Sequence, residues 1–80
     1  MTRVTVLYFA SLRDAARIAS EAVETQAADL GELYAQLQLR HGFSMPRERL
    51  RVAVDGVFAR WEDATREGSE IAFIPPVSGG

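Results

Sequence analysis

Two apolar segments near opposite ends of the chain restrict its fold more than any other feature. Residues 3–9 read RVTVLYF and residues 71–74 read IAFI, and both are rich in β-branched or aromatic side chains. Strands that are apolar throughout are usually covered on both faces or flanked closely by neighbours. A chain of 80 residues has room for a single core. We therefore expect these two strands to pair in parallel at the centre of one sheet.

A short helix and an edge strand are predicted after the first strand. Ser11 is the expected N-cap of the helix, with Asp14 three residues later. The apolar positions of this helix recur on one stripe, namely Leu12, Ala15, Ala16 and Ala19. Residues 21–25 are short and polar, which suits an edge strand that pairs with the first strand.

The main helix is predicted from its start and stop signals. Asp29 and Glu32 form a variant of the capping box, and Gly42 supplies a C-terminal stop. Between these signals the apolar residues recur at helical spacing, namely Leu30, Leu33, Tyr34 and Leu37. A helix of this length would cover one face of a sheet.

A hairpin and a proline pair complete the predicted elements. Apolar and other side chains alternate over residues 50–54, and Asp55-Gly56 offers a type I′ turn into Val57-Phe58. Pro75 and Pro76 would end the last strand because they lack two backbone donors. The sequence thus supplies four or five strands and one main helix.

This order of elements predicts an α+β fold of the ubiquitin-like β-grasp type, with a mixed sheet packed on the main helix. We expect one domain over residues 1–80. Within it, residues 1–74 would form the globular body and residues 75–80 an extended, flexible tail that ends in Gly-Gly.

Composition excludes several kinds of function. The chain has no cysteine and a single histidine, so it offers no disulfide, no thiol nucleophile and no recognisable metal site. Its net charge of −2 and its scattered arginines argue against nucleic-acid binding. No apolar run approaches the roughly 20 residues of a membrane span, and no signal peptide is recognisable. We expect a cytoplasmic protein.

The predicted tail is the most unusual chemical feature of the chain. It begins with two stiff residues and ends with two that lack side chains: Pro75, Pro76, Val77, Ser78, Gly79 and Gly80. If extended, these residues would reach about 20 Å, enough to enter the active site of another protein. A terminal carboxyl has a pKa of about 3.5 and is an unreactive anion at neutral pH. Adenylation by ATP would activate the Gly80 carboxylate, and a persulfide would then convert it to a thiocarboxylate.

The two ends of the sequence resemble a known family. Residues 6–14 (VLYFASLRD) and 70–80 (EIAFIPPVSGG) are similar to the small subunit of molybdopterin synthase, and the resemblance spans the whole chain. It implies that a ubiquitin-activating-like adenylyltransferase activates Gly80. It also implies that the resulting thiocarboxylate supplies sulfur to cyclic pyranopterin monophosphate inside a heterotetramer with the large synthase subunit.

The resemblance further implies roles for individual residues and for cofactors. The chain would be non-catalytic alone, would bind no cofactor stably and would depend on ATP consumed by the activating enzyme. Phe73 is expected at the partner interface. The residues expected to thread into the partner's active site are Pro75, Pro76, Val77, Ser78 and Gly79. Asp55, Thr65 and Ser69 depart from the family's usual pattern.

Three alternatives remain open at this point. The chain would also suit a sulfur carrier for thiazole formation in thiamin biosynthesis, a ubiquitin-like modifier conjugated through Gly80, or a β-grasp interaction domain with a silent tail. Trp61 would serve either as a partner anchor or as a core aromatic. His41 is expected to be a helix-terminal or surface residue rather than a metal ligand. Asp14 and Glu32 are assigned to helix capping rather than to acid–base chemistry.

Overall fold

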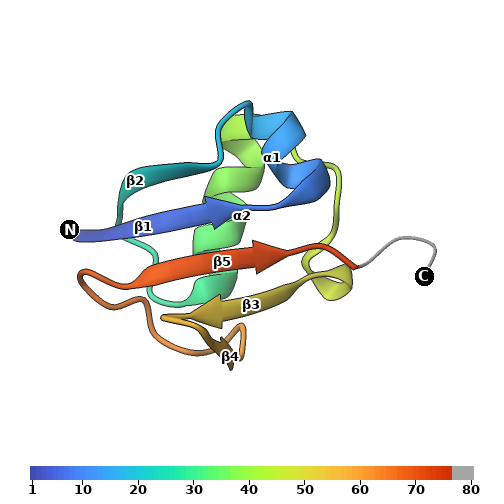
Figure 1. Cartoon of the computed structure of the whole chain (residues 1–80). Coiled ribbons are helices and arrows are strands. Elements are labelled where there is room, and N and C mark those ends of the chain that lie inside the picture. The colour runs from blue at the N-terminus through green and yellow to red at the C-terminus, as the bar shows by residue number, and fades with distance from the viewer. Residues whose placement is uncertain (77–80) are drawn as a thin grey trace.

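The fold is a mixed five-stranded sheet with one main helix across one of its faces. The computed structural model describes residues 1–76, and Figure 1 shows how their elements are arranged. The strands are β1 (Thr2–Tyr8), β2 (Ser20–Thr25), β3 (Arg51–Val54), β4 (Val57–Ala59) and β5 (Glu70–Ile74). The helices are α1 (Ala10–Ala16), α2 (Leu30–His41) and the short 3-10 helix η1 (Arg47–Arg49).

The first and last strands pair in parallel at the centre of the sheet, as predicted. The strand order is β2-β1-β5-β3-β4, so β1 and β5 are each flanked on both sides. Val6 lies opposite Ile71 and Tyr8 lies opposite Phe73 in the parallel pair. β2 pairs with β1 in antiparallel orientation at one edge, which confirms the predicted edge strand. The hairpin of β3 and β4 forms the other edge.

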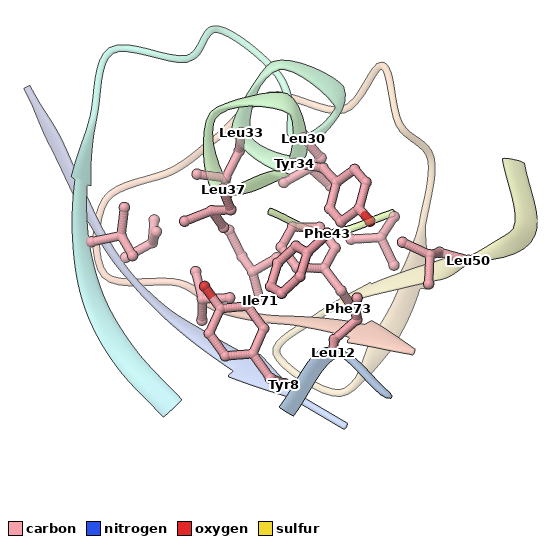
Figure 2. Packing of buried hydrophobic residues seen from close by; sticks show 14 residues of the cluster. Tyr8, Leu12, Leu30, Leu33, Tyr34, Leu37, Phe43, Leu50, Ile71 and Phe73 are labelled. Atoms are coloured by element: carbon pink, nitrogen blue, oxygen red, sulfur yellow. The ribbon is translucent and has the colours of Figure 1, made fainter. Parts of the chain in front are cut away.

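The core lies between the sheet and α2. Figure 2 shows side chains of α2 pointing toward those of the sheet strands. Leu33 and Leu37 of α2 and Ile71 and Phe73 of β5 are all completely buried. Successive side chains of a strand point to opposite faces of the sheet. The remaining residues of the central strands therefore form an outer sheet face, on the side away from α2.

Both predicted ends of α2 are confirmed. Oδ1 of Asp29 accepts a hydrogen bond from the backbone N–H of Glu32 at 2.8 Å. Oε1 of Glu32 accepts one from the N–H of Ala28 at 2.9 Å, which completes a capping-box variant. At the other end Gly42 has φ of 72° and donates its N–H to the carbonyl of Gln38. Glycine adopts this left-handed conformation without steric cost.

The predicted cap of α1 is wrong. The N-cap is Phe9, without a capping side chain, so Ser11 lies inside the helix and Asp14 caps nothing. Leu12 is the buried residue of this helix, and it packs into the core. The helix ends at Arg17, which adopts a left-handed φ of 62°, so the predicted apolar stripe does not reach Ala19. A seven-residue helix anchored by a buried leucine forms without either signal.

The predicted turn between β3 and β4 is confirmed, and it is also tied to β5. Asp55 and Gly56 both have positive φ values, 51° and 86°, as a type I′ turn requires. Asp55 exchanges two hydrogen bonds with the backbone of Glu70, at 2.8 and 2.9 Å. Asp55 therefore has a structural role, because it joins the turn to β5. The sequence reasoning did not predict η1, which leads from Pro46 into β3.

Burial along α2 predicts a sharp contrast between two leucines of the same helix. Leu37 is completely buried, whereas Leu39 is 88% exposed. Leu37→Ala should lower the free energy of unfolding by about 2–5 kcal/mol because it leaves a cavity in the core. Leu39→Ala should change it by less than about 0.5 kcal/mol. Urea denaturation of both variants measures the difference, and equal effects would contradict the packing described here.

Candidate functional site

The candidate site lies where β5 ends and the predicted tail begins. Ile74 is the last residue of β5 and pairs with Arg51, the first residue of β3. Pro75 follows and is buried, and Pro76 is exposed. Neither proline can donate a backbone hydrogen bond to a neighbouring strand. The sheet ladder therefore stops here. We call Ile74, Pro75 and Pro76 the tail root.

A pocket opens beside the tail root. It has a volume of about 300 Å³ and combines apolar side chains with two guanidinium groups. Its lining residues are Arg49, Arg51, Phe58, Ile74, Pro75 and Pro76. They come from the consecutive elements η1, β3 and β4 and from the tail root, which is distant from them in sequence. A pocket with an apolar floor and a few polar groups suits recognition of a partner side chain.

The pocket continues into an apolar row across the outer sheet face. Paired residues of neighbouring strands point to the same face. Leu7 pairs with Ala72, Ala72 with Ala53, and Ala53 with Phe58, so this row crosses four strands. The two alanines in the middle of the row have short side chains, and Phe58 at its edge is 63% exposed. Phe58 is thus the exposed residue of this row, while Leu7 and Ala72 are half-buried and Ala53 is buried.

The structure corrects the prediction that Phe73 contacts a partner. Its side chain is completely buried and stacks on Trp61, with ring centroids 5.9 Å apart and planes inclined by 7°. Because side chains alternate along β5, Phe73 points toward α2 while Ile74 points to the outer face. Trp61 also packs against Tyr34, so it is a core aromatic in this structure. Phe73 therefore packs in the core next to the tail root and contributes no exposed surface.

Among the predicted tail residues, the structure places Pro75 and Pro76. Val77, Ser78, Gly79 and Gly80 lie outside the described residues. The predicted roles of these four residues therefore stay predictions. Within residues 1–76 no group of histidine, aspartate and glutamate side chains is arranged to hold a metal ion.

Sequence reasoning missed the exposed part of the site, namely Phe58, Arg49 and Arg51. A signal for Phe58 and Arg51 was nevertheless present. A two-residue type I′ turn fixes the hairpin register, and the alternation in residues 50–54 assigns Arg51 and Ala53 to the face opposite the core. Phe58 pairs with Ala53 and must share that face. No comparable local signal placed Arg49.

A cluster of polar side chains lies at the end of β1, where Tyr8 pairs with Phe73 of β5. The hydroxyl of Tyr8 donates to Oε2 of Glu21 at 2.5 Å. Nε2 of His41 lies 2.7 Å from the same oxygen, and Arg40 approaches the other oxygen at 3.5 Å. His41 thus sits at a helix end beside a carboxylate, in line with its predicted placement. This cluster ties β1, β2 and α2 together.

The cluster changes the pKa of two of its members. Burial disfavours the Glu21 carboxylate, but hydrogen bonds from Tyr8 and His41 and the charges of His41 and Arg40 outweigh it. The pKa of Glu21 is therefore lowered. The pKa of Tyr8 is raised by burial, by its hydrogen bond to Glu21 and by the charge of that carboxylate. Tyr8 consequently stays neutral and acts as a hydrogen-bond donor.

Comparison with known proteins identifies the family. The sequence model of the ThiS family matches residues 6–80. The chain belongs to the ThiS family. This ThiS-family protein is 38% identical to the molybdopterin synthase sulfur carrier subunit of Mycobacterium tuberculosis, and the match covers all of both chains.

Solved structures agree with this membership. SAMP1 from Haloferax volcanii is 27% identical, with a TM-score of 0.82 and coverage of 98% of this chain and 99% of SAMP1. A chain in the complex of subunits 1 and 2 of the molybdopterin-converting factor from Helicobacter pylori is 25% identical. Its TM-score is 0.68, with coverage of 99% of this chain and 100% of that chain. The predicted ubiquitin-like β-grasp fold is thereby confirmed.

The lowered pKa of Glu21 predicts a loss of stability in acid. The stabilisation from this group is fully present above the pKa of the unfolded chain, near 4.5, and is lost as pH falls through the lower folded pKa. Glu21→Gln should therefore be less stable than the wild type at neutral pH, and the difference should shrink as the pH falls below 4.5. Urea midpoints across this range measure it.

Glu24→Gln is the matched control for that experiment. Glu24 pairs with Arg3 on the surface, where both side chains are more than half exposed. Exposed pairs contribute little to stability. A difference between Glu21→Gln and the wild type that did not depend on pH would contradict the assignment.

Proposed function

We propose that this protein is the sulfur carrier subunit of a molybdopterin synthase. The observation that carries the proposal is the full-length similarity to the sulfur carrier subunit of Mycobacterium tuberculosis, at 38% identity. The tail root supports it, because β5 lies at the centre of the sheet and is followed at once by two prolines, which cannot continue the sheet ladder. A carrier of this kind needs a rigid body and a terminus that can reach another active site.

The proposed chemistry takes place at the carboxyl group of Gly80. In an activating enzyme related to ubiquitin-activating enzymes, a carboxylate oxygen attacks the α-phosphorus of ATP and releases pyrophosphate. The terminal sulfur of a persulfide then displaces AMP at the carbonyl carbon, and a second thiol cleaves the S–S bond to leave the thiocarboxylate. ATP is thus consumed by the activating enzyme, and the carrier itself binds no cofactor.

The charged carrier would then act inside the synthase. The large subunit would receive the tail and bind cyclic pyranopterin monophosphate, whose conversion to the dithiolene of molybdopterin takes two sulfur atoms. A heterotetramer of two large and two small subunits suits this need. The complex of subunits 1 and 2 from Helicobacter pylori supports such a pairing. The large subunit would contact the body of the carrier at the outer sheet face beside the tail root.

A protein modifier is the second candidate function. The similarity to SAMP1, a small archaeal modifier protein, favours it. As a modifier, this chain would form isopeptide bonds between Gly80 and lysines of target proteins. It contains no lysine of its own, so chains of this protein could not grow through its side chains. A carrier for thiazole formation in thiamin biosynthesis would use the same sulfur-carrier chemistry.

The decisive measurement is the intact mass of the protein after incubation with ATP, the activating enzyme and a sulfur donor. We expect a gain equal to the mass difference between sulfur and oxygen, confined to the C-terminal peptide. Removing Gly80, or adding one residue after it, should abolish both this gain and the sulfuration of the pterin while leaving the fold intact. Retained sulfuration in either variant would exclude the proposal, and conjugates on target lysines would favour the modifier.

The proposed use of the outer sheet face predicts a binding defect for Phe58. Phe58→Ser should weaken binding to the large subunit by roughly 30-fold, as expected for the loss of an aromatic anchor of about 2 kcal/mol. Leu39→Ser is the control, because Leu39 is also exposed but belongs to α2 on the opposite side of the domain. Calorimetric titration measures both. Equal affinities for Phe58→Ser and the wild type would place the interface elsewhere.

A further inference from the structure

Two arginines, Arg49 and Arg51, flank the tail root. Arg51 lies directly opposite Ile74 in the pairing of β3 with β5. Arg49 is the last residue of η1 and lines the same pocket. Both side chains are exposed. Any partner that accepts the tail must therefore approach these two positive charges.

The guanidinium of Arg51 is oriented by an aromatic ring. Its central carbon lies 5.3 Å from the centroid of the Phe58 ring. Such cation–π contacts are favourable and keep the guanidinium close to the ring. A guanidinium presented in this way can donate two parallel hydrogen bonds to a carboxylate. Phe58 thus serves both as apolar surface and as the support for a charge.

The charges of Arg49 and Arg51 have no acidic partner among residues 1–76. The ion pairs within that range join Arg3 to Glu24, Glu21 to Arg40 and His41, and Arg47 to Glu48. Other exposed arginines also lack such a partner, but Arg49 and Arg51 differ from them because they line an apolar pocket. Covering this pocket would desolvate both groups. That is costly for an unpaired charge and favourable only when an anionic group compensates it.

We infer that the large subunit presents a carboxylate beside an apolar side chain at this site. The carboxylate pairs with Arg51, with Arg49 adding to the local positive potential, and the apolar side chain enters the pocket between Phe58, Ile74 and Pro76. The inference rests on the proposed function, because it concerns the partner that receives the tail. The contact surface of the large subunit is then negatively charged, and Arg51 is the residue that recognises this charge.

The simpler alternative is that Arg51 only covers apolar surface with its aliphatic stem. Arginine stems often pack in this way, and removing one lowers stability through lost packing. That role predicts a less stable Arg51→Gln variant whose binding keeps the salt dependence of the wild type. Recognition of a carboxylate predicts the reverse, namely a stable variant whose affinity is lower and less sensitive to salt.

The test is the affinity of the purified large subunit for wild type, Arg51→Gln and the Arg49→Gln/Arg51→Gln double variant at low and high salt. Arg66→Gln is the charge-matched control, since Arg66 is exposed and precedes β5 at the end of the strand away from the tail root. Arg51→Gln should bind about tenfold more weakly at low salt, the double variant more weakly still, and both should lose most of the salt dependence. The near-ultraviolet signal of Trp61 and urea midpoints check folding.

The outcomes separate this inference from the proposed function. Binding of Arg51→Gln that equals the wild type and Arg66→Gln at both salt concentrations would overturn the inference, while ATP-dependent mass gain and pterin sulfuration by the wild type would leave the proposed function intact. Weaker adenylation with unchanged binding to the large subunit would also overturn it, because the charges would then serve the activating enzyme. A wild-type protein that does not bind the large subunit at all would overturn both.

Discussion

The parallel pairing of β1 with β5 is the interaction on which the rest of the structure depends. Two adjacent parallel strands cannot be joined by a tight turn, and the chain between them must cross one face of the sheet. Here α2 lies in that crossover and covers the face that carries Val6, Ile71 and Phe73. The same pairing brings the end of β5 beside the end of β1, so the tail root lies next to the start of α1.

β5 also joins the core to the candidate site. Its inward residues, Ile71 and Phe73, are completely buried, while Ala72 and Ile74 belong to the outer sheet face. Any change in the packing of Phe73 against Trp61 would therefore shift the residue next to it in the chain. The tail root is thus the direct continuation of a strand whose inward side chains are fixed in the core.

Local signals in the sequence were reliable where the interaction itself is local. The capping of α2 by Asp29 and Gly42 and the turn at Asp55 depend on residues within a few positions of one another, and all were predicted correctly. The cap at Ser11 was predicted by the same logic and was wrong. α1 spans seven residues and is anchored by the burial of Leu12, so tertiary packing outweighed a marginal capping signal.

The amino-acid sequence predicted the order of the strands and of the main helix and the chemistry that the chain can and cannot offer, but it did not predict η1. The absence of cysteine and lysine and the Pro-Pro start of the predicted tail can be read directly from it. The tertiary structure alone decided which side chains surround the tail root. Arg51 lies opposite Ile74 because β3 pairs with β5, which is distant in sequence, and the hairpin register of β3 with β4 adds Phe58 to the same face. Such contacts depend on how strands align across the sheet, and the same arrangement buries Phe73 and leaves Ile74 half-buried on the outer face.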